Sequence, residues 1–419
     1  MEESQKIRTF NSTFKGANPT SLNACVGENG IQNTQTYAEG YRDAAKLLLD
    51  DVVRKNQHTN DTSDINTLIF PIVFCMRHAV ELQLKDAIST LNDLRPNHNV
   101  QNYKISGSHD IGLIWKFFRK ESMKTDRRYE PLNAKLATYV SDIAEIDPTG
   151  QTFRYPHDIS EDKHLTQTPI INLRNLKIRF ESLQILLIEL DNLNNLLIEE
   201  YSQGTHTQEL SRHDLLHIAK ELPDRHLWGS KSDNFVTIKR SIRDHYGISN
   251  GKFSKAGYLI EHHYEFSKLI GIESPLNYAK EEDFVIFFEI SNKLHTDEKS
   301  NKDSLGTDYF SRFDTDAGIQ QIIEYSDLSA LCTQECIDKI SQHSMADIAT
   351  IFELGRKHTY CEYYQKHLKN IEEEFTSYSS NTEDYSRKVG HILEKTNAKE
   401  AILNGLEILG QETIISCLS

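Results

Sequence analysis

Four ionisable side chains interrupt a strongly apolar segment, "CMRHAVELQLKDAI", at residues 75–88. They are Arg77, His78, Glu81 and Lys85. Apolar helices seldom bury such groups unless the groups are paired or functional. Arg77 and Glu81 are four residues apart, as are Glu81 and Lys85, so these three side chains form one polar stripe on a helix. His78 lies beside the stripe and can titrate near neutral pH.

Three interpretations of this stripe are open. Its side chains can cover a solvated face, form a ladder of structural ion pairs, or line a pocket inside a helical bundle. In the third case Arg77, His78, Glu81 and Lys85 are binding residues.

A second group of ionisable residues has the spacing of a metal site. In "HDLLH", His213 and His217 lie one helical turn apart. Asp214 stands where zinc proteases of the HExxH type place the Glu that activates water. No clear third ligand follows, and His262 and His263 are the only candidates. We therefore expect no metal and no cofactor, and no phosphate loop, nucleophile elbow or dinucleotide fingerprint is found.

Composition limits the class of protein. A chain of 419 residues is expected to form two or three domains. The net charge of −15 argues against a protein that coats nucleic acid over its whole surface, although it allows a local basic site. Six cysteines without framework spacing indicate reduced thiols and a cytoplasmic location. No apolar run appears long enough to span a bilayer, and the polar segment at residues 1–16 lacks the apolar stretch of a signal peptide, so no membrane association is expected.

Apolar periodicity predicts helices along most of the chain, and no alternating stretch requires a sheet. The predicted fold class is all-α. We expect an irregular arm at 1–34, a helical bundle at 35–204 and a C-terminal helical domain at 205–419. Helices of the last domain are expected at 233–246, 254–270, 280–294, 315–341, 345–375 and 382–416, with a polar loop at 296–308.

The strongest helical pattern covers residues 173–203. Leucine and aromatic residues recur there at alternating steps of four and three, which is a heptad seam. Asn194 occupies an a position, where one polar group commonly fixes register and partner number. Two interpretations are open: a central helix of an intramolecular bundle, or a coiled coil that forms a homodimer.

The order of these segments resembles that of HEPN-like helical-bundle domains. The resemblance rests on "FPIVFCMRHAVELQLKDAI", "HDIGLIW", "FRYPHD" and the Leu-rich helix that follows, and it covers about residues 36–203. It implies a helical bundle in a ribonuclease of toxin–antitoxin, CRISPR-associated or anti-phage systems, or in an inactive member used for dimerisation or binding. Active members usually act as dimers that join two Arg-x(4–6)-His motifs.

That motif has a clear chemical purpose. Cleavage of RNA through its 2′-hydroxyl needs a base and an acid at the phosphate, and a cation that stabilises developing charge. Within 36–203 no Arg precedes a His at this spacing, which departs from the family pattern. Beyond the bundle, "RHDLLH" supplies Arg212 and His217 on a helix that Ser211 and Asp214 cap. "RSIRDH" (240–245) is a second match. The first is preferred because its second position is a polar His, as active family members prefer a polar residue there, and because it lies on a capped helix.

The loop "FRYPHD" supplies another candidate pair, Arg154 and His157. These residues could meet Arg77 and His78 at one end of the bundle. Alternatively, Arg154 bonds loop carbonyls and Asp147 and so fixes the loop.

Two functions follow as hypotheses. The first is an RNA-targeting protein, a metal-independent endoribonuclease of microbial defence, with Arg212, His217, Arg154 and His157 as candidate catalytic residues. The second is a non-catalytic module that forms a homodimer through the 173–203 helix and binds a protein partner through its C-terminal domain.

Overall fold

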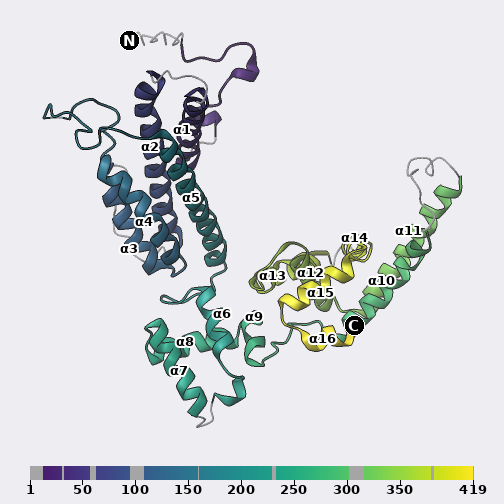
Figure 1. Ribbon diagram of the computed structural model, residues 1–419. Coiled ribbons are helices and arrows are strands. Elements are labelled where there is room, and N and C mark those ends of the chain that lie inside the picture. The colour runs from purple at the N-terminus through teal and green to yellow at the C-terminus, as the bar shows by residue number, and fades with distance from the viewer. Residues whose placement is uncertain are drawn as a thin grey trace, which may run out of the picture. The chain divides into compact units, whose positions relative to one another are not determined.

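The computed structural model describes residues 13–30, 33–56, 63–94, 108–158, 160–228, 233–301, 316–378 and 382–418. Within these ranges the chain forms sixteen α-helices, four short 3-10 helices and no strand (Figure 1), apart from one isolated bridge between His157 and Lys163. The all-α prediction is confirmed. The chain divides into two compact units, Met1–Ser202 and Gln203–Ser419, which we describe separately.

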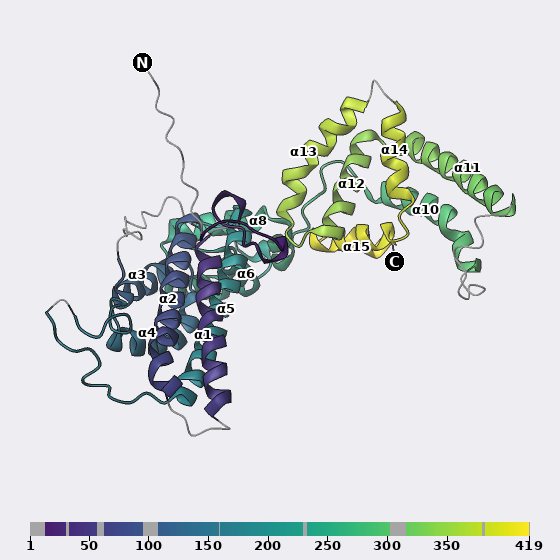
Figure 2. The ribbon, with the colours of Figure 1, turned by 90° about the horizontal axis from the view of Figure 1, so that it is seen from above.

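Five long helices build unit 1. They are α1 (Thr34–Asn56), α2 (Ser63–Leu94), α3 (Ile111–Thr125), α4 (Tyr129–Ile146) and α5 (Leu173–Ser202), preceded by η1 (Thr20–Leu22) and η2 (Gly27–Asn29). Helix α2 contacts α1, α3 and α5, and α4 contacts α3 and α5. Figures 1 and 2 show α1, α2 and α5 side by side. Because α2 touches three neighbours, it contributes buried side chains to both apolar clusters of this unit.

The Leu-rich seam of α5 faces the core of its own unit. Leu183, Leu187, Leu190 and Leu197 are buried among residues of α2, α3 and α4. Asn194 is also buried, and its Oδ1 accepts a hydrogen bond of 2.7 Å from the Tyr129 hydroxyl. The predicted helix at 173–203 is confirmed, and within the described residues its seam serves the intramolecular bundle.

Helix α2 contains Pro71, at its ninth residue. By length and composition α2 is also the one helix of the described residues that could cross a membrane, and 33% of its most apolar window is buried. The expectation that no apolar run approaches this length was wrong, because mean hydropathy tolerates a few charged residues such as Arg77 and Glu81. Core helices of soluble proteins meet the same criterion.

Unit 2 is built from shorter helices around two apolar cores. The first core is formed by α6 (Arg212–Glu221), η3 (Arg225–Leu227), α7 (Asp233–Tyr246), α8 (Asn250–Glu261), α9 (Tyr264–Ser267) and η4 (Lys268–Ile270). The second is formed by α10 (Glu281–Asn301), α11 (Asp316–Lys339), α12 (Gln342–Lys357), α13 (Glu362–Ser377), α14 (Thr382–Leu393), α15 (Ala398–Ile408) and α16 (Glu412–Leu418). Helices α12 and α15 pack closely because Gly355 and Gly405 face each other's backbones: a Cβ at Gly355 would meet the Ala401 carbonyl at 1.9 Å.

Several long helices predicted for unit 2 are divided in the structure. The segment 254–270 contains the end of α8, then α9 and η4, and 345–375 contains parts of α12 and α13. The segment 382–416 contains α14, α15 and part of α16. Apolar periodicity continues across these breaks, whereas local caps such as Ser341 and His263 set where each helix begins. Of the predicted loop, 296–301 belongs to α10 and 302–308 lies outside the described residues.

Candidate functional site

The polar stripe of α2 is a buried ladder of ion pairs. The exposed fractions of Arg77, Glu81 and Lys85 are 2%, 1% and 9%. Glu81 joins the other two, since its Oε2 lies 2.5 Å from Arg77 Nη1 and its Oε1 lies 2.6 Å from Lys85 Nζ. A solvated stripe is therefore wrong for these residues, because the apolar neighbours of α2 cover all three.

Arg77 also holds two other segments against α2. Its Nε donates to the Asp147 carbonyl at 2.9 Å, and its Nη2 donates to the carbonyls of Pro148 at 2.8 Å and His109 at 2.5 Å. These bonds fix the loop that follows α4 and the residues that precede α3. One hypothesis from the sequence was that Arg154 bonds the loop carbonyls near Asp147. In the structure, Arg77 makes these bonds.

The Glu81 carboxylate is stabilised in its charged form. Burial alone would raise its pKa, but hydrogen bonds from His78, Lys85, Arg77 and His109 hold the pKa of Glu81 well below its usual range. Among these donors, His109 is exposed and its Nδ1 lies 3.0 Å from Glu81 Oε1. A carboxylate whose oxygens are already occupied by cations is suited to a structural role rather than to proton transfer.

Next to the ladder, rings and a guanidinium stack on the surface of unit 1. The His78 imidazole meets the Tyr41 ring edge-on at 4.5 Å and stacks on Phe74 at 5.7 Å with an interplanar angle of 10°. The Arg154 guanidinium lies 5.5 Å from the centre of the Phe74 ring and 5.3 Å from that of Tyr155. We call these five residues the aromatic–arginine face. Arg154 and Tyr155 are exposed, and the other three are half-buried.

A buried anchor positions the loop that carries Arg154. Phe153 is 5% exposed and its ring lies 6.4 Å from that of Phe70 on α2. Arg154 and His78 therefore lie against the same Phe74 ring, whereas Arg77, which the hypothesis also placed in this group, is bonded to Glu81 instead. His157 is exposed in the same loop, where it pairs with Lys163 across the isolated bridge.

A cavity of about 340 Å³ adjoins this region. It lies between α2, α4, α5 and the loop before α5. Arg77 and Phe153 are among its lining residues, and most of the others are apolar. The pocket interpretation of the stripe thus holds only for Arg77, because Glu81 and Lys85 do not line this cavity.

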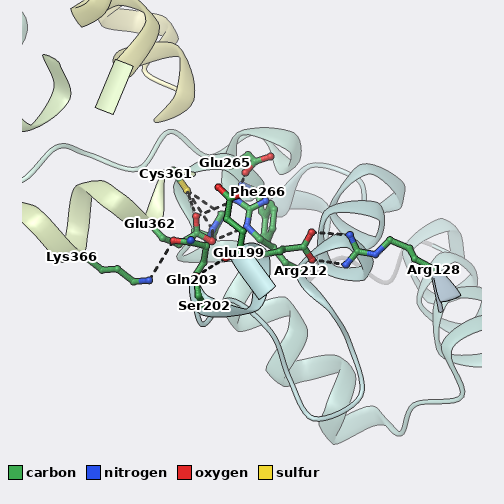
Figure 3. A network of polar contacts seen from close by, with 12 residues as sticks. Arg128, Glu199, Ser202, Gln203, Arg212, Glu265, Phe266, Cys361, Glu362 and Lys366 are labelled. Atoms are coloured by element: carbon green, nitrogen blue, oxygen red, sulfur yellow. Dashed lines mark hydrogen bonds and ion pairs between the residues drawn. The ribbon is translucent and has the colours of Figure 1, made fainter. Parts of the chain in front are cut away.

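In unit 2, Arg212 is held in a network of acidic residues (Figure 3). Its Nε donates to Glu362 Oε1 at 2.8 Å, its Nη2 donates to Glu362 Oε2 at 3.2 Å, and its Nη2 also donates to Glu265. Arg212 is 7% exposed, whereas His217 is exposed. Five residues of helix place the two side chains about 140° apart around α6. The structure therefore does not bring Arg212 and His217 together on one exposed surface.

The network continues through residues that sequence reasoning did not combine. His263 Nε2 lies 3.0 Å from Glu362 Oε1, and Cys361 Sγ lies 3.4 Å from His263 Nε2. Burial would raise the pKa of Glu362, but hydrogen bonds from His263 and Arg212 hold it well below its usual range, whereas burial raises the pKa of the Cys361 thiol. His263 and Cys361 are 98 residues apart, so no local spacing could have revealed the cluster.

The histidine pair considered as a zinc site is located on α6. The rings of His213 and His217 are 4.4 Å apart, and His217 is exposed. His262, one candidate for a third ligand, is exposed directly after the end of α8, where its Nδ1 lies 2.8 Å from the Tyr258 carbonyl. His263, the other candidate, is bonded to Glu362 instead.

In comparisons with known proteins, no protein-family model, curated protein or solved structure matches this chain. The HEPN-like assignment stays a prediction from the sequence.

Proposed function

We propose that this protein is an RNA-targeting protein whose unit 1 binds single-stranded RNA on the aromatic–arginine face. The observation that carries the proposal is the continuous stack of Tyr41, His78, Phe74 and Arg154, with Tyr155 beside it. Single-stranded nucleic acids bind to proteins by stacking bases on aromatic rings and on Arg guanidinium planes, with positive charge along the backbone.

The charge distribution supports a local rather than a global RNA site. The chain is acidic overall, with a net charge of −15. On this face, however, Arg154 is exposed and pairs with aromatic rings instead of a carboxylate in the described contacts. Its charge is therefore directed to a surface where a phosphate could approach.

The HEPN-like resemblance implies metal-independent cleavage of the bound RNA. It also implies a role in microbial defence. We assign the cleavage to His78 and His157 as proton-transfer groups and to Arg154 as the cation at the phosphate. All three lie on the aromatic–arginine face or in the loop that builds it. Arg212 is a weaker candidate, because two carboxylates already neutralise it.

Binding and cleavage of short RNAs test this function. We expect unstructured RNA to bind the wild type, and Arg154→Ala/Tyr155→Ala to weaken binding by roughly 30-fold or more, since the variant removes two stacking contacts of about 1–3 kcal/mol each. Cleavage should survive a chelator and leave 2′,3′-cyclic phosphate ends, because the substrate's own 2′-hydroxyl attacks. His78→Ala should lower the cleavage rate by about 10²–10⁴-fold.

Two controls define the outcome. Tyr258→Ala removes a ring that is 63% exposed in unit 2 and should leave RNA binding unchanged. RNA that binds the Arg154→Ala/Tyr155→Ala variant as tightly as the wild type would exclude the face. Binding without cleavage would retain the RNA site and reject the ribonuclease activity.

A second function, a protein-interaction module, is favoured by one observation. Ile178, Ile185, Ile188 and Leu196 lie on the outer side of α5 and are 45–60% exposed. Apolar side chains at this spacing form one exposed strip along a helix, which is typical of a surface that a partner covers.

A further inference from the structure

The polar cluster of unit 2 combines three donor types that zinc prefers. His263 Nε2 is 3.0 Å from Glu362 Oε1, and Cys361 Sγ is 3.4 Å from His263 Nε2 and 3.5 Å from Glu362 Oε2. All three donor atoms lie within 4.8 Å of one another. Tetrahedral zinc with S, N and O ligands places neighbouring donor atoms about 3.3–3.6 Å apart. One ion could thus be accommodated by small rotations of these side chains.

We propose that His263, Cys361 and Glu362 bind one zinc ion, with water at the fourth position. Cys361 is 1% exposed, and the side chains of His263 and Glu362 are each 9% exposed. A thiolate, an imidazole nitrogen and a carboxylate form a ligand set typical of zinc, whereas calcium and magnesium prefer oxygen ligands alone. The site differs from the His213–His217 pair, which offers two ligands on an exposed helix face.

The charges of the buried cluster favour a dication. His263 Nδ1 accepts from the Phe266 backbone N–H at 3.3 Å, so its other ring nitrogen, Nε2, is the one that faces Glu362. With the thiol and the imidazole counted as neutral, Glu265 and Glu362 contribute −2 and Arg212 contributes +1, which leaves −1. Zinc adds +2 and releases the Cys361 proton to solvent, so the occupied cluster is neutral. Buried charge is unfavourable unless it is balanced.

Binding requires two local rearrangements. The ring proton of His263 moves from Nε2 to Nδ1, which gives up the hydrogen bond that caps the four-residue helix α9. The Glu362 carboxylate keeps its bonds to Arg212 on one side and directs a second lone pair at the ion, as ligands with outer partners commonly do. In the absence of zinc, the same residues form a closed hydrogen-bond network.

The location suggests what zinc would do. His263 stacks on Phe266, which belongs to the core of α6–α9, while Cys361 belongs to the core of α10–α16. An ion held by both segments would join the two cores of unit 2. We therefore assign the site a structural role, which is independent of RNA binding by unit 1.

Metal analysis of the full-length chain, purified without a histidine tag, tests the proposal. We expect about one zinc per chain, lost in Cys361→Ser and in His263→Ala. Cys332→Ser is the matched control, because Cys332 is also buried but lies outside the cluster. His213→Ala/His217→Ala controls for the exposed histidine pair. Both controls should keep the zinc.

Cobalt substitution gives a readout that does not depend on the folding of a variant. Wild-type protein exchanged with Co²⁺ should show a thiolate-to-cobalt charge-transfer band, and a chelator should abolish the band and lower the melting temperature. A wild type that contains no zinc, takes up none and shows no such band would overturn the proposal. Zinc that survives Cys361→Ser but is lost from His213→Ala/His217→Ala would also overturn it.

Discussion

Gly150 lies directly against the guanidinium of Arg77. A Cβ at position 150 would stand 3.0 Å from Arg77 Nη1, and Gly150 has a φ of +79°. Arg77 cannot easily move away, because Glu81 and the carbonyls of Asp147 and Pro148 hold it. The loop after α4 therefore closes over the buried ladder only with a residue that has no side chain and tolerates the left-handed conformation.

Gly150→Ala should destabilise unit 1. The left-handed conformation alone costs an L-residue about 1–2 kcal/mol, and displacement of Arg77 should add to this loss. Gly247→Ala is the matched control, since Gly247 has a φ of +64° and nothing within 4 Å of a Cβ. Urea unfolding should show a larger loss for Gly150→Ala, and equal losses would contradict the contact with Arg77.

Glu81→Gln should lower the free energy of unfolding by roughly 3–5 kcal/mol, because it leaves Arg77 and Lys85 buried without their shared carboxylate. Glu189→Gln is the control: Glu189 pairs with Lys135 on the surface at 3.7 Å, and loss of such a pair has little effect. Chemical denaturation of both variants measures the difference. A Glu81→Gln protein as stable as the wild type would show that the ladder contributes no net stability.

The stability of Glu81→Gln should depend on pH in a different way from that of the wild type. The folded pKa of Glu81 is held below its unfolded value of about 4.5, so its stabilisation is present above that pH and is lost as the pH falls. The stability difference between wild type and Glu81→Gln should therefore be constant from pH 8 to about 5 and shrink below about 4.5. Thermal melts over this range give the difference, and a gap that widens in acid would contradict the direction of the shift.

Asp191→Asn should stabilise the protein at neutral pH. Burial, together with the charge of Asp86, raises the pKa of Asp191 to about 6. Between its unfolded value of 3.8 and about 6, the folded state binds more protons, so stability falls as pH rises through this window. The amide removes this cost, which we expect to be roughly 1–2 kcal/mol at pH 7.5, because solvent screens part of the charge of this half-buried group, and absent near pH 4. Melting temperatures of the wild type and Asp191→Asn at pH 7.5 and pH 4 measure the difference. A variant that is no more stable than the wild type at pH 7.5 would contradict the raised pKa of Asp191.

Opposite sides of α5 should respond differently to a charge. Ile185 is 60% exposed, whereas Leu187 is fully buried. If the outer isoleucines form a homodimer, Ile185→Asp/Ile188→Asp should convert a dimer to a monomer with unchanged circular dichroism. Leu187→Asp should instead unfold unit 1, since it places an unpaired charge in the core. Light scattering of the wild type at high micromolar concentration comes first, and a monomer there would rule out the dimer.

The sequence by itself determined the all-α class and the long helix α5. Apolar residues at three- and four-residue steps marked α5 closely, because helical periodicity is a local property of the chain. Local caps were also readable, such as the reciprocal bonds of Ser211 and Asp214 at the start of α6. The breaks within unit 2 were not predicted, because similar apolar spacing continues on both sides of each turn.

Only the tertiary structure decided which polar residues act together. Arg77 and Glu81 could be paired from their spacing, but their burial depended on α3, the loop after α4 and the neighbours of α2. Arg154 could be named from a loop motif, while the ring it covers, Phe74, lies 80 residues earlier in sequence. The cluster of His263 and Cys361 required the packing of distant helices. Charge and stacking interactions depend on distance and on exclusion of water, which no local sequence pattern encodes.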